Sequence, residues 1–489
     1  MIVKDGLPFS IVNSVTFRAF IGLLNKNYRI CDRKQLREKL DTKFEAIKAK
    51  MKDAISSSDA VSLTTDLWTD KHNCNSYIAI TCHFLWKNNV NSFCIATKEM
   101  RETHTANNLE RMILAILTDW NISTNQVTSV TTDNGRNIVN DVKNLFGAYK
   151  WLPCFAHTLN LVVTDSLSAS PAVSEIIHKV KNLVTFFKQS TNASNTLKSI
   201  QENDNSTPLK LKQSVITRWN SVHTMIDRFI SVYKYVSIAC INIDSSPDCV
   251  TKDELSILKE ISSLLKPFFD ATTEMSAEKY STCSKILPMI SMIKASLFNI
   301  NVDAEVSKIL KSNLIASFEK RFSQSEKQKL IAISTVCDPR FKRLYFTDPT
   351  VPSRVQRDIE AMLSDTVCTQ VQDDDDNIDG LWTFHRKVID SNSALFNDSS
   401  SASLKSYLAQ NVIDLKRDPI EFWNNEINKE SYPELRKVAL KYMLIPATSV
   451  PSERVFSRAG FCLNSYRSSL EPKRAEKLIM LSSVDDEFW

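Results

Sequence analysis

Three short runs rich in β-branched and aromatic residues follow one another between residues 61 and 99. They read VSLTTDLW, YIAITCHFLW and NSFCIATKEM, and polar residues separate them. Runs of this length and composition are typical of consecutive strands, since β-branched and aromatic side chains pack well on a pleated surface. The sequence therefore predicts an antiparallel meander of three strands.

A helix and a fourth strand are predicted next. In TANNLERMILAILTDW, apolar residues recur at i, i+3, i+4, i+7, i+8 and i+11, which places them on one helical face. These residues are Leu109, Met112, Ile113, Ile116, Leu117 and Trp120. The segment 126–135, QVTSVTTDNG, has the composition of a strand and ends in a turn signal. A helix, RNIVNDVKNLF, and a short apolar run, WLPC, follow.

From about residue 170 to residue 430 the pattern is helical, and the whole chain has only 6 glycines to interrupt it. Two segments differ from this pattern: 201–208, and an acidic and serine-rich stretch near 368–403. Low hydrophobicity with clustered charge or serine predicts disordered, mobile loops in both.

The C-terminal part of the chain returns to strong patterning. After Pro433, a helical stripe is formed by Leu435, Val438, Ala439, Tyr442 and Met443, with aromatic residues such as Trp423 at its entrance. These apolar and aromatic residues pack either in the core of the monomer or against a partner chain at an interface. The stretch 451–474 is rich in arginine and lysine, which suits a solvated helix face or contact with nucleic acid.

Composition excludes several classes of protein. The 489 residues suffice for about three domains. No stretch approaches the roughly 18 apolar residues of a membrane helix, and the N-terminus lacks the pattern of a secretion signal, so we expect a soluble protein with reduced cysteines. The 11 cysteines include no C-x-x-C pair, so no structural zinc is expected. The net charge of +5 is compatible with nucleic acid but does not require it.

Asp66 is unusual because it stands in the middle of a strand pattern. Strand alternation places it on the face of Thr64 and Trp68, opposite Leu63 and Leu67. A strand-end or hydrogen-bonded core aspartate would explain this residue by itself. However, Asp133 ends the fourth predicted strand in the same way, with SVTTD echoing SLTTD. Two carboxylates on neighbouring strands are a plausible cradle for a divalent cation such as Mg²⁺ or Mn²⁺.

An ordered set of motifs makes this pattern more specific. From about residue 8 to its end, the chain resembles the hAT family of DDE transposases, whose fold is RNase H-like. The motifs read PFSIVNSVTF, SLTTDLWTD, HTANNLE, TTDNGRNI, CFAHTLNL, TRWNS, CDPRFK, DPIEFW and YPELRKVALKYMLIPATSVPSERVFSRAG.

The resemblance implies an α+β fold, in which an RNase H-like mixed sheet is interrupted by a large all-α insertion domain and followed by a C-terminal helical hAT dimerisation region. The expected domains are an N-terminal helical segment (1–58), the first part of the RNase H-like domain (59–170), the all-helical insertion with its disordered loops (171–417), and the dimerisation region that completes the RNase H-like fold (418–489).

The resemblance also assigns catalytic and metal-binding roles to Asp66, Asp133 and Glu453. The last of these stands in PSERVFS, beyond the predicted insertion. A triad of this kind would hold two ions, Mg²⁺ or Mn²⁺, for DNA strand cleavage and transfer.

Further residues are expected to contact DNA by similarity. A zinc site at Cys154 and His157 would need two more ligands, so core packing of Cys154 and a DNA contact by His157 are the alternatives. In TRWNS, Trp219 suits stacking on a flipped base while its neighbour holds phosphate, or else a buried tryptophan beside an ion pair. The expected DNA-binding residues are His157, Arg218, Trp219, Arg454, Arg458 and Arg467.

Two functions follow from the resemblance. One is a nuclear transposase that binds DNA and forms a homodimer or higher homo-oligomer through its C-terminal region. The other is a domesticated, non-catalytic regulator of transcription or chromatin that acts as a dimer. Family members commonly carry an N-terminal BED zinc finger, which the resemblance here does not include. Sequence-specific DNA recognition is therefore not expected of this chain, whether it is a fragment or a derivative.

Overall fold

The structure is a computed structural model that forms two compact units. Unit 1 comprises Met1–Cys154, Glu278–Ile286 and Glu326–Trp489, and unit 2 comprises Phe155–Ala277 and Leu287–Ser325. The described residues are 2–69, 76–100, 106–215, 219–276, 283–367, 402–462 and 471–489. The predicted acidic and serine-rich loop falls almost wholly outside these ranges. None of the helices within them is long and apolar enough to span a membrane.

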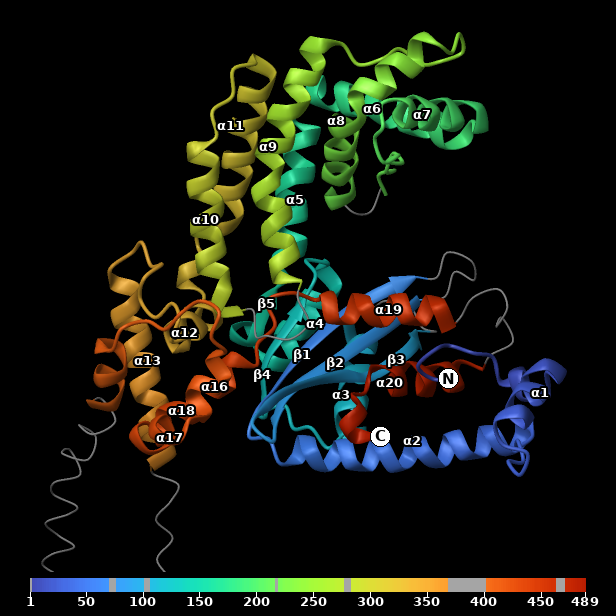
Figure 1. Ribbon diagram of the computed structural model, residues 1–489. Helices are drawn as coiled ribbons and strands as arrows, with labels where there is room; N and C mark the ends of the chain where they lie inside the picture. The colour runs from blue at the N-terminus through green and yellow to red at the C-terminus, as the bar shows by residue number, and fades with distance from the viewer. Residues whose placement is uncertain are drawn as a thin grey trace, which may run out of the picture. The chain divides into compact units, whose positions relative to one another are not determined.

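Unit 1 contains a mixed sheet of five strands in the order β3-β2-β1-β4-β5 (Figure 1). The first three strands are antiparallel neighbours, while β4 lies parallel to both β1 and β5. The bounds are β1 (Val61–Thr69), β2 (Ser76–Trp86), β3 (Asn89–Met100), β4 (Val127–Thr132) and β5 (Trp151–Pro153). The predicted meander and fourth strand are confirmed, and the short apolar run WLPC supplies β5.

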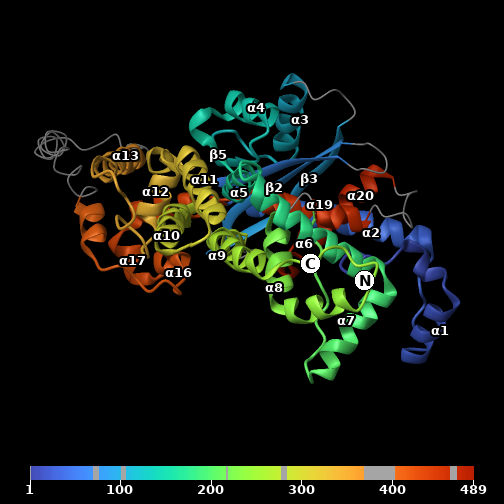
Figure 2. The ribbon, with the colours of Figure 1, turned by 90° about the horizontal axis from the view of Figure 1, so that it is seen from above.

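Helices cover both faces of this sheet. On one face, α2 (Arg33–Ser56), α3 (Ala106–Asp119) and α4 (Arg136–Phe146) share a large apolar core with strand residues such as Leu63. On the other face, α19 (Val450–Cys462) lies across β1 and β2 (Figures 1 and 2). The helix α20 (Pro472–Ser483) packs along β3 and contributes apolar residues to the cores of both faces. The expected α+β class with an RNase H-like mixed sheet is therefore confirmed.

Unit 1 contains further helices, of which η2 lies between β4 and β5 in the chain and η4 begins at the last residue of unit 2. They are η1 (Phe9–Asn13), α1 (Val15–Leu24), η2 (Ala148–Lys150), η3 (Cys283–Lys285), η4 (Ser325–Lys327), α12 (Lys329–Cys337), α13 (Thr350–Val367), α16 (Pro419–Asn424), α17 (Glu426–Ser431), α18 (Pro433–Met443) and η6 (Asp486–Phe488). Residues 402–409 are also helical.

Unit 2 is built from helices in its described part. They are α5 (Phe155–Ser168), α6 (Pro171–Gln189), α7 (Thr191–Asn203), α8 (Trp219–Ile241), α9 (Lys252–Met275) and α11 (Glu305–Phe322), together with most of α10 (Ile286–Asn299). The helical pattern predicted for this part of the sequence is confirmed. The predicted domain boundaries stay a prediction.

The CDPRFK motif, for which the sequence suggested no chemistry, forms a buried clamp in unit 1. The Arg340 guanidinium donates to both carboxylate oxygens of Asp338, at 2.9 and 2.6 Å, and Ser284 Oγ donates to Asp338 Oδ2 at 2.7 Å. Lys342 Nζ donates to the carbonyls of Tyr407 and Gln410, both at 2.6 Å. The positive charge of Lys342 is stabilising at the carbonyls that end a helix. The motif therefore connects the end of the helix 402–409 to the turn after α12.

Trp423, from the DPIEFW motif, belongs to the core of its own chain. Its side chain is fully buried and contacts the rings of Tyr407 and Tyr432, with centroids 4.9 and 6.4 Å away. Its Nε1 donates to the carbonyl of Cys337 at 3.0 Å. The stripe from Leu435 to Met443 is also buried. These side chains are therefore occupied within the monomer.

Candidate functional site

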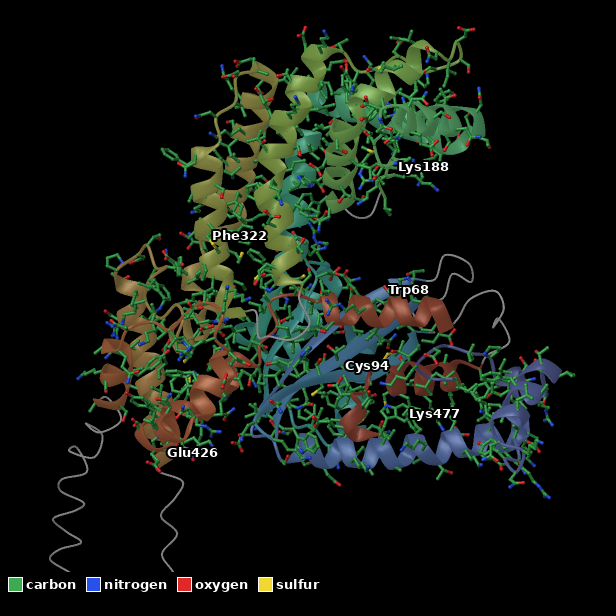
Figure 3. The ribbon with its side chains drawn as sticks, in the orientation of Figure 1. Trp68, Cys94, Lys188, Phe322, Glu426 and Lys477 are labelled. Carbon is green, nitrogen blue, oxygen red and sulfur yellow. The ribbon has the colours of Figure 1, made fainter. Side chains whose placement is uncertain are left out.

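Asp66 lies near the end of β1 on the face that α19 covers. Leu67, its neighbour, packs into the core shared with α2, α3 and α4, whereas Trp68 packs against α19, where its ring stacks on Phe456 at 5.8 Å (Figure 3). The predicted alternation of faces is confirmed. Asp66 Oδ1 accepts a hydrogen bond from the backbone N–H of Leu67 at 2.8 Å, which holds the carboxylate at the strand.

Asp133 follows β4, the parallel neighbour of β1. The carboxyl ends of parallel strands meet at one edge of a sheet, so β4 delivers Asp133 near Asp66. Asp133 Oδ1 accepts the N–H of Gly135 at 3.1 Å. A Cβ on Gly135 would lie 3.1 Å from that same oxygen, tighter than an ordinary contact. Glycine at 135 therefore leaves room for the carboxylate.

Glu453 stands in the first turn of α19, on the helix that crosses the sheet. The loop before the helix is anchored to the strand side of unit 1. Thr131 Oγ1 donates to the carbonyl of Pro446 at 2.8 Å, and the N–H of Ser449 donates to Cys154 Sγ at 3.2 Å. Because Thr131 is on β4 and Cys154 directly follows β5, the loop delivers α19 to the parallel half of the sheet.

A chain of buried hydroxyls then fixes α19 to the sheet. Ser452, next to Glu453, hydrogen-bonds through Oγ to Thr64 Oγ1 at 2.7 Å, and Thr64 pairs with Thr81 Oγ1 across the strands at 2.5 Å. Thr81 in turn meets His83 Nε2 at 3.0 Å. All four side chains are buried. Breaking such a chain leaves a buried polar group unpaired, at a cost of about 1–3 kcal/mol, so it holds the start of α19 in register with β1.

The charges of Asp133 and Glu453 both act on Asp66. The pKa of Asp66 is raised to about 7, first because burial removes water from its carboxylate, then because the negative charges of Asp133 and Glu453 oppose its ionisation. The hydrogen bond from Leu67 acts in the opposite direction and is weaker. Two charged residues that are distant from Asp66 in the sequence thus act on its carboxyl group in the fold.

The donor atoms of this group suit a divalent cation, but their grouping in the described part of the structure does not form a metal site. Carboxylate oxygens are the ligands preferred by Mg²⁺ and Mn²⁺, and a cation would remove the repulsion that raises the pKa of Asp66. Within the ranges that the structure describes, no three His, Cys, Asp or Glu residues are grouped so that they could hold a metal ion. The catalytic and metal-binding roles of Asp66, Asp133 and Glu453 therefore stay predictions.

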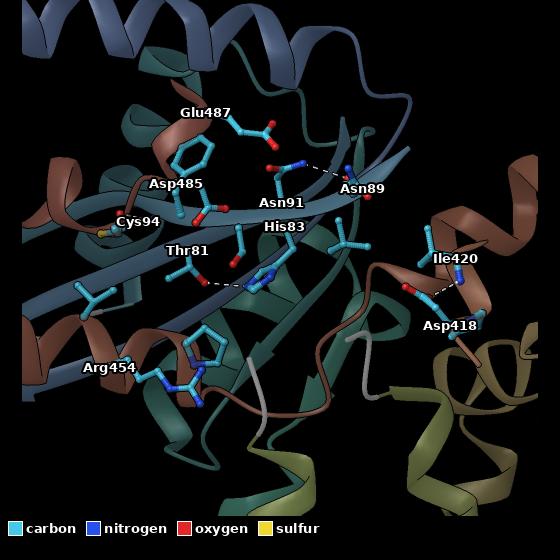
Figure 4. Close-up of a pocket in the computed structure, with 17 residues that line it drawn as sticks. Thr81, His83, Asn89, Asn91, Cys94, Asp418, Ile420, Arg454, Asp485 and Glu487 are labelled. Carbon is cyan, nitrogen blue, oxygen red and sulfur yellow. Dashed lines mark hydrogen bonds between the residues drawn. The ribbon is translucent and has the colours of Figure 1, made fainter. Parts of the chain in front are cut away.

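A cavity of about 500 Å³ lies beside the hydroxyl chain in unit 1. Thr81 and His83 line it from β2, and Arg454 lines it from α19 (Figure 4). Burial lowers the pKa of His83 to about 4, so the imidazole is neutral near pH 7. Arg454, predicted to contact DNA, is half-buried at this cavity.

The other predicted residues lie elsewhere. His157 is half-buried on α5 of unit 2, and Cys154 is buried in unit 1, where its sulfur accepts the Ser449 amide. Trp219 begins α8 in unit 2 and is only 7% exposed, as the buried-tryptophan alternative predicts. Arg218 and Arg467 lie outside the described residues, as does the side chain of Arg458. The DNA-contacting roles stay predictions.

Four supporting residues were not identified from the sequence: Thr64, Thr81, His83 and Ser452. Strand alternation already places Thr64 on the face of Asp66, so this residue could have been found. By contrast, nothing local in the sequence connects Thr64 to Ser452, which lies 388 residues away.

Comparisons with known proteins agree with this architecture. Family models match for the ZBED1 RNase-like domain over residues 64–153, the ZBED1 RNase-like helical domain over 152–264, and the hAT family C-terminal dimerisation region over 403–483.

Similar curated proteins cover 98% of the chain at low identity. They include human "Zinc finger BED domain-containing protein 4" (22% identical), "Putative AC transposase" of Zea mays (24%) and "Putative transcriptional regulator tpeD" of Talaromyces stipitatus (23%). The chain spans 42%, 63% and 60% of their respective lengths.

Proposed function

We propose that this chain, which belongs to the hAT family of transposases and transposase-derived proteins, is a nuclear DNA-binding protein that acts as a homodimer or higher homo-oligomer and retains a two-metal site for cutting and joining DNA. The observation that carries the catalytic part is that the negative charges of Asp133 and Glu453 both act on the carboxyl group of Asp66. Nuclear localisation is supported by the transposase and transcriptional regulator names of the relatives.

Asp66, Asp133 and Glu453 would hold the ions, each from a differently anchored element. When bound, two Mg²⁺ or Mn²⁺ ions would activate a water or a DNA 3′-hydroxyl and stabilise the leaving oxygen. The protein would supply the negatively charged ligands and fix their positions. The strands β1 and β4 are hydrogen-bonded to each other, and the buried hydroxyl groups that include Ser452 hold α19, which carries Glu453, on the sheet.

DNA affinity in this proposal comes from backbone contacts by basic residues such as Arg454. Such contacts tolerate sequence differences and weaken steeply with salt. We expect anisotropy measurements on duplex and hairpin-forming DNA to show weak, salt-dependent and sequence-tolerant binding. A nanomolar, salt-insensitive preference for one duplex sequence would contradict this expectation.

Metal-dependent nicking by the purified chain tests the catalytic part. We expect Mg²⁺ or Mn²⁺ to support nicking of hairpin-forming DNA, and Asp66→Asn and Glu453→Gln each to reduce the rate at least about 100-fold, which is the scale of a lost metal ligand or its support. Glu305→Gln, an exposed carboxamide substitution in unit 2, is the matched control and should keep the wild-type rate.

Metal binding gives a second readout that does not require activity. Titration calorimetry with Mn²⁺ should show binding by the wild-type chain and by Glu305→Gln, and at least tenfold weaker binding by Asp66→Asn. Binding without nicking would favour the non-catalytic regulator. Identical Mn²⁺ binding by wild type and Asp66→Asn would reject the proposed metal site.

The dimerisation proposal rests on the matched region 403–483 and on what its surface exposes. Since Trp423 is buried in its own chain, other residues must form the interface. Val412, Leu415 and Ile427 are 42%, 64% and 70% exposed, and exposed apolar side chains within a dimerisation region are natural contact points.

Sedimentation equilibrium of the full chain tests this interface. We expect a dimer or larger species at tens of micromolar, converted toward monomer by Leu415→Glu combined with Ile427→Glu. Ile309→Glu is the control, because Ile309 is 49% exposed in unit 2, outside the matched region. A wild-type chain that sediments as a monomer would count against the proposal.

A further inference from the structure

Two cysteines that the proposed function does not use meet where α8 and α9 are connected in unit 2. Cys240 lies one residue before the end of α8, and Cys249 lies three residues before the start of α9. Their thiols lie close enough for each to be the main influence on the pKa of the other, and both residues are half-buried.

The contacts around the pair explain why the two thiols meet. Tyr233 and Cys240 are seven residues apart on α8, two helical turns, so they lie on the same face. The Tyr233 hydroxyl donates to the carbonyl of Val250 at 2.8 Å, and Val250 is buried. The next residue, Thr251, begins α9 with a capping box. Cys249, directly before Val250, is therefore held against the face of α8 that carries Cys240.

The two thiols are chemically unequal. The neighbouring Cys249 thiol lowers the pKa of Cys240, whereas the neighbouring Cys240 thiol and burial raise the pKa of Cys249. A thiolate is the reactive form of cysteine, so this inequality favours Cys240 as the nucleophile and Cys249 as the resolving thiol. Solvent reaches this region, since Pro247 and Asp248 line an open pocket of about 620 Å³ together with residues of α6.

We propose that Cys240 and Cys249 are a modification site that reacts with hydrogen peroxide and closes to an intrachain disulfide. The Cys240 thiolate attacks one peroxide oxygen; the O–O bond breaks, hydroxide leaves and takes up a proton to become water, and Cys240 becomes a sulfenic acid. The Cys249 sulfur then attacks the Cys240 sulfur; the S–O bond breaks, and the departing hydroxide takes the thiol proton as a second water. Two thiols are oxidised, and one peroxide is reduced to two waters.

Other cysteines of the described residues provide the contrast. Cys82, Cys283 and Cys337 are buried, and burial raises the pKa of each thiol, which makes them unreactive. Cys31 is half-buried like the pair and, within the described ranges, is not bonded to another cysteine. It is therefore the matched control for accessibility without a partner.

Peptide mass spectrometry of the full chain tests the proposal directly. Trypsin cleaves after Lys234 and Lys252, so the peptide 235–252 contains both cysteines, whereas Cys31 falls in 30–33. After brief exposure to hydrogen peroxide and then alkylation, we expect 235–252 to have lost two hydrogens and to carry no alkyl group. Reduction should restore two alkylation sites. The Cys31 peptide should remain alkylated, reacting at least about tenfold more slowly with peroxide.

Two variants separate the roles of the thiols. In Cys249→Ser, the sulfenic acid at Cys240 has no resolving thiol and should be trapped by dimedone. In Cys240→Ser, Cys249 should stay reduced. The proposal is overturned if the wild-type peptide 235–252 keeps two alkylated cysteines under conditions that oxidise Cys31, or if Cys249 oxidises equally fast when Cys240 is replaced.

Discussion

Replacing Trp423 by alanine should destabilise the monomer rather than merely weaken its association. The side chain is fully buried among aromatic rings, and such a truncation costs about 3–5 kcal/mol through lost burial and the cavity that remains. The carbonyl of Cys337 also loses its donor, which adds about 1–3 kcal/mol. A local loss of about 4 kcal/mol or more corresponds to roughly a thousandfold increase in opening of this region.

Hydrogen exchange measured by mass spectrometry localises this effect, which a global unfolding midpoint of a two-unit chain would not. We expect protection of amides in α12, α18 and the helix 402–409 to fall about a thousandfold in Trp423→Ala. Trp423→Phe keeps a ring but not the N–H donor, so it should lose only about 1–3 kcal/mol. Leu344→Ala, at a position of unit 1 that is 63% exposed and outside the proposed interface, should change local stability by less than about 0.5 kcal/mol.

A different result would show that the role of Trp423 has been misread. If Trp423→Ala left exchange in these helices unchanged but converted a dimer to a monomer in sedimentation, the tryptophan would be an interface residue and not a core residue. The core assignment is supported if Trp423→Ala loses amide protection at the same protein concentration as wild type. In that case the folded fraction of the variant should keep the wild-type oligomeric state.

Three further perturbations test the site and its supports. His83 has a folded-state pKa of about 4, below the ordinary value of 6.5, so between these pH values only the unfolded chain takes up a proton. The free energy of unfolding should therefore fall on acidification, by about 2 kcal/mol at pH 5. Chemical denaturation measures this fall, which should be smaller in His83→Asn. Gly135→Ala should displace the Asp133 carboxylate and cost about 1 kcal/mol, roughly fivefold in Mn²⁺ affinity by calorimetry, while thermal unfolding remains cooperative. Lys342→Met removes the donor to the carbonyls at the end of the helix 402–409 and should cost about 2–4 kcal/mol, measured by amide exchange in that helix; unchanged exchange would show that the lysine does not hold it.

Local pattern in the sequence was enough for the elements and for much of the sheet. The strand alternation around Asp66 predicted that Leu67 and Trp68 face opposite cores, and the structure confirms it, because the side-chain period of a strand is two residues whatever the rest of the chain does. The helical faces and the strand-helix order followed from the same kind of local periodicity. The placement of Glu453 near the aspartates came from the resemblance and not from any pattern in the residues.

Tertiary structure alone decided which distant residues support one another. Nothing in the sequence around Ser452 or Thr64 indicates that they are hydrogen-bonded to each other. Likewise, Asp338, Lys342 and Trp423 each bind a residue that is distant in the sequence and close in the fold. The sequence gives no sign that Cys240 and Cys249 are neighbours, whereas in the structure Tyr233 holds Val250, next to Cys249, against α8. Periodicity reports which face a residue occupies within its own element. The partner that covers that face is determined by the whole chain, because the native fold is the arrangement whose packing and hydrogen bonds together have the lowest free energy.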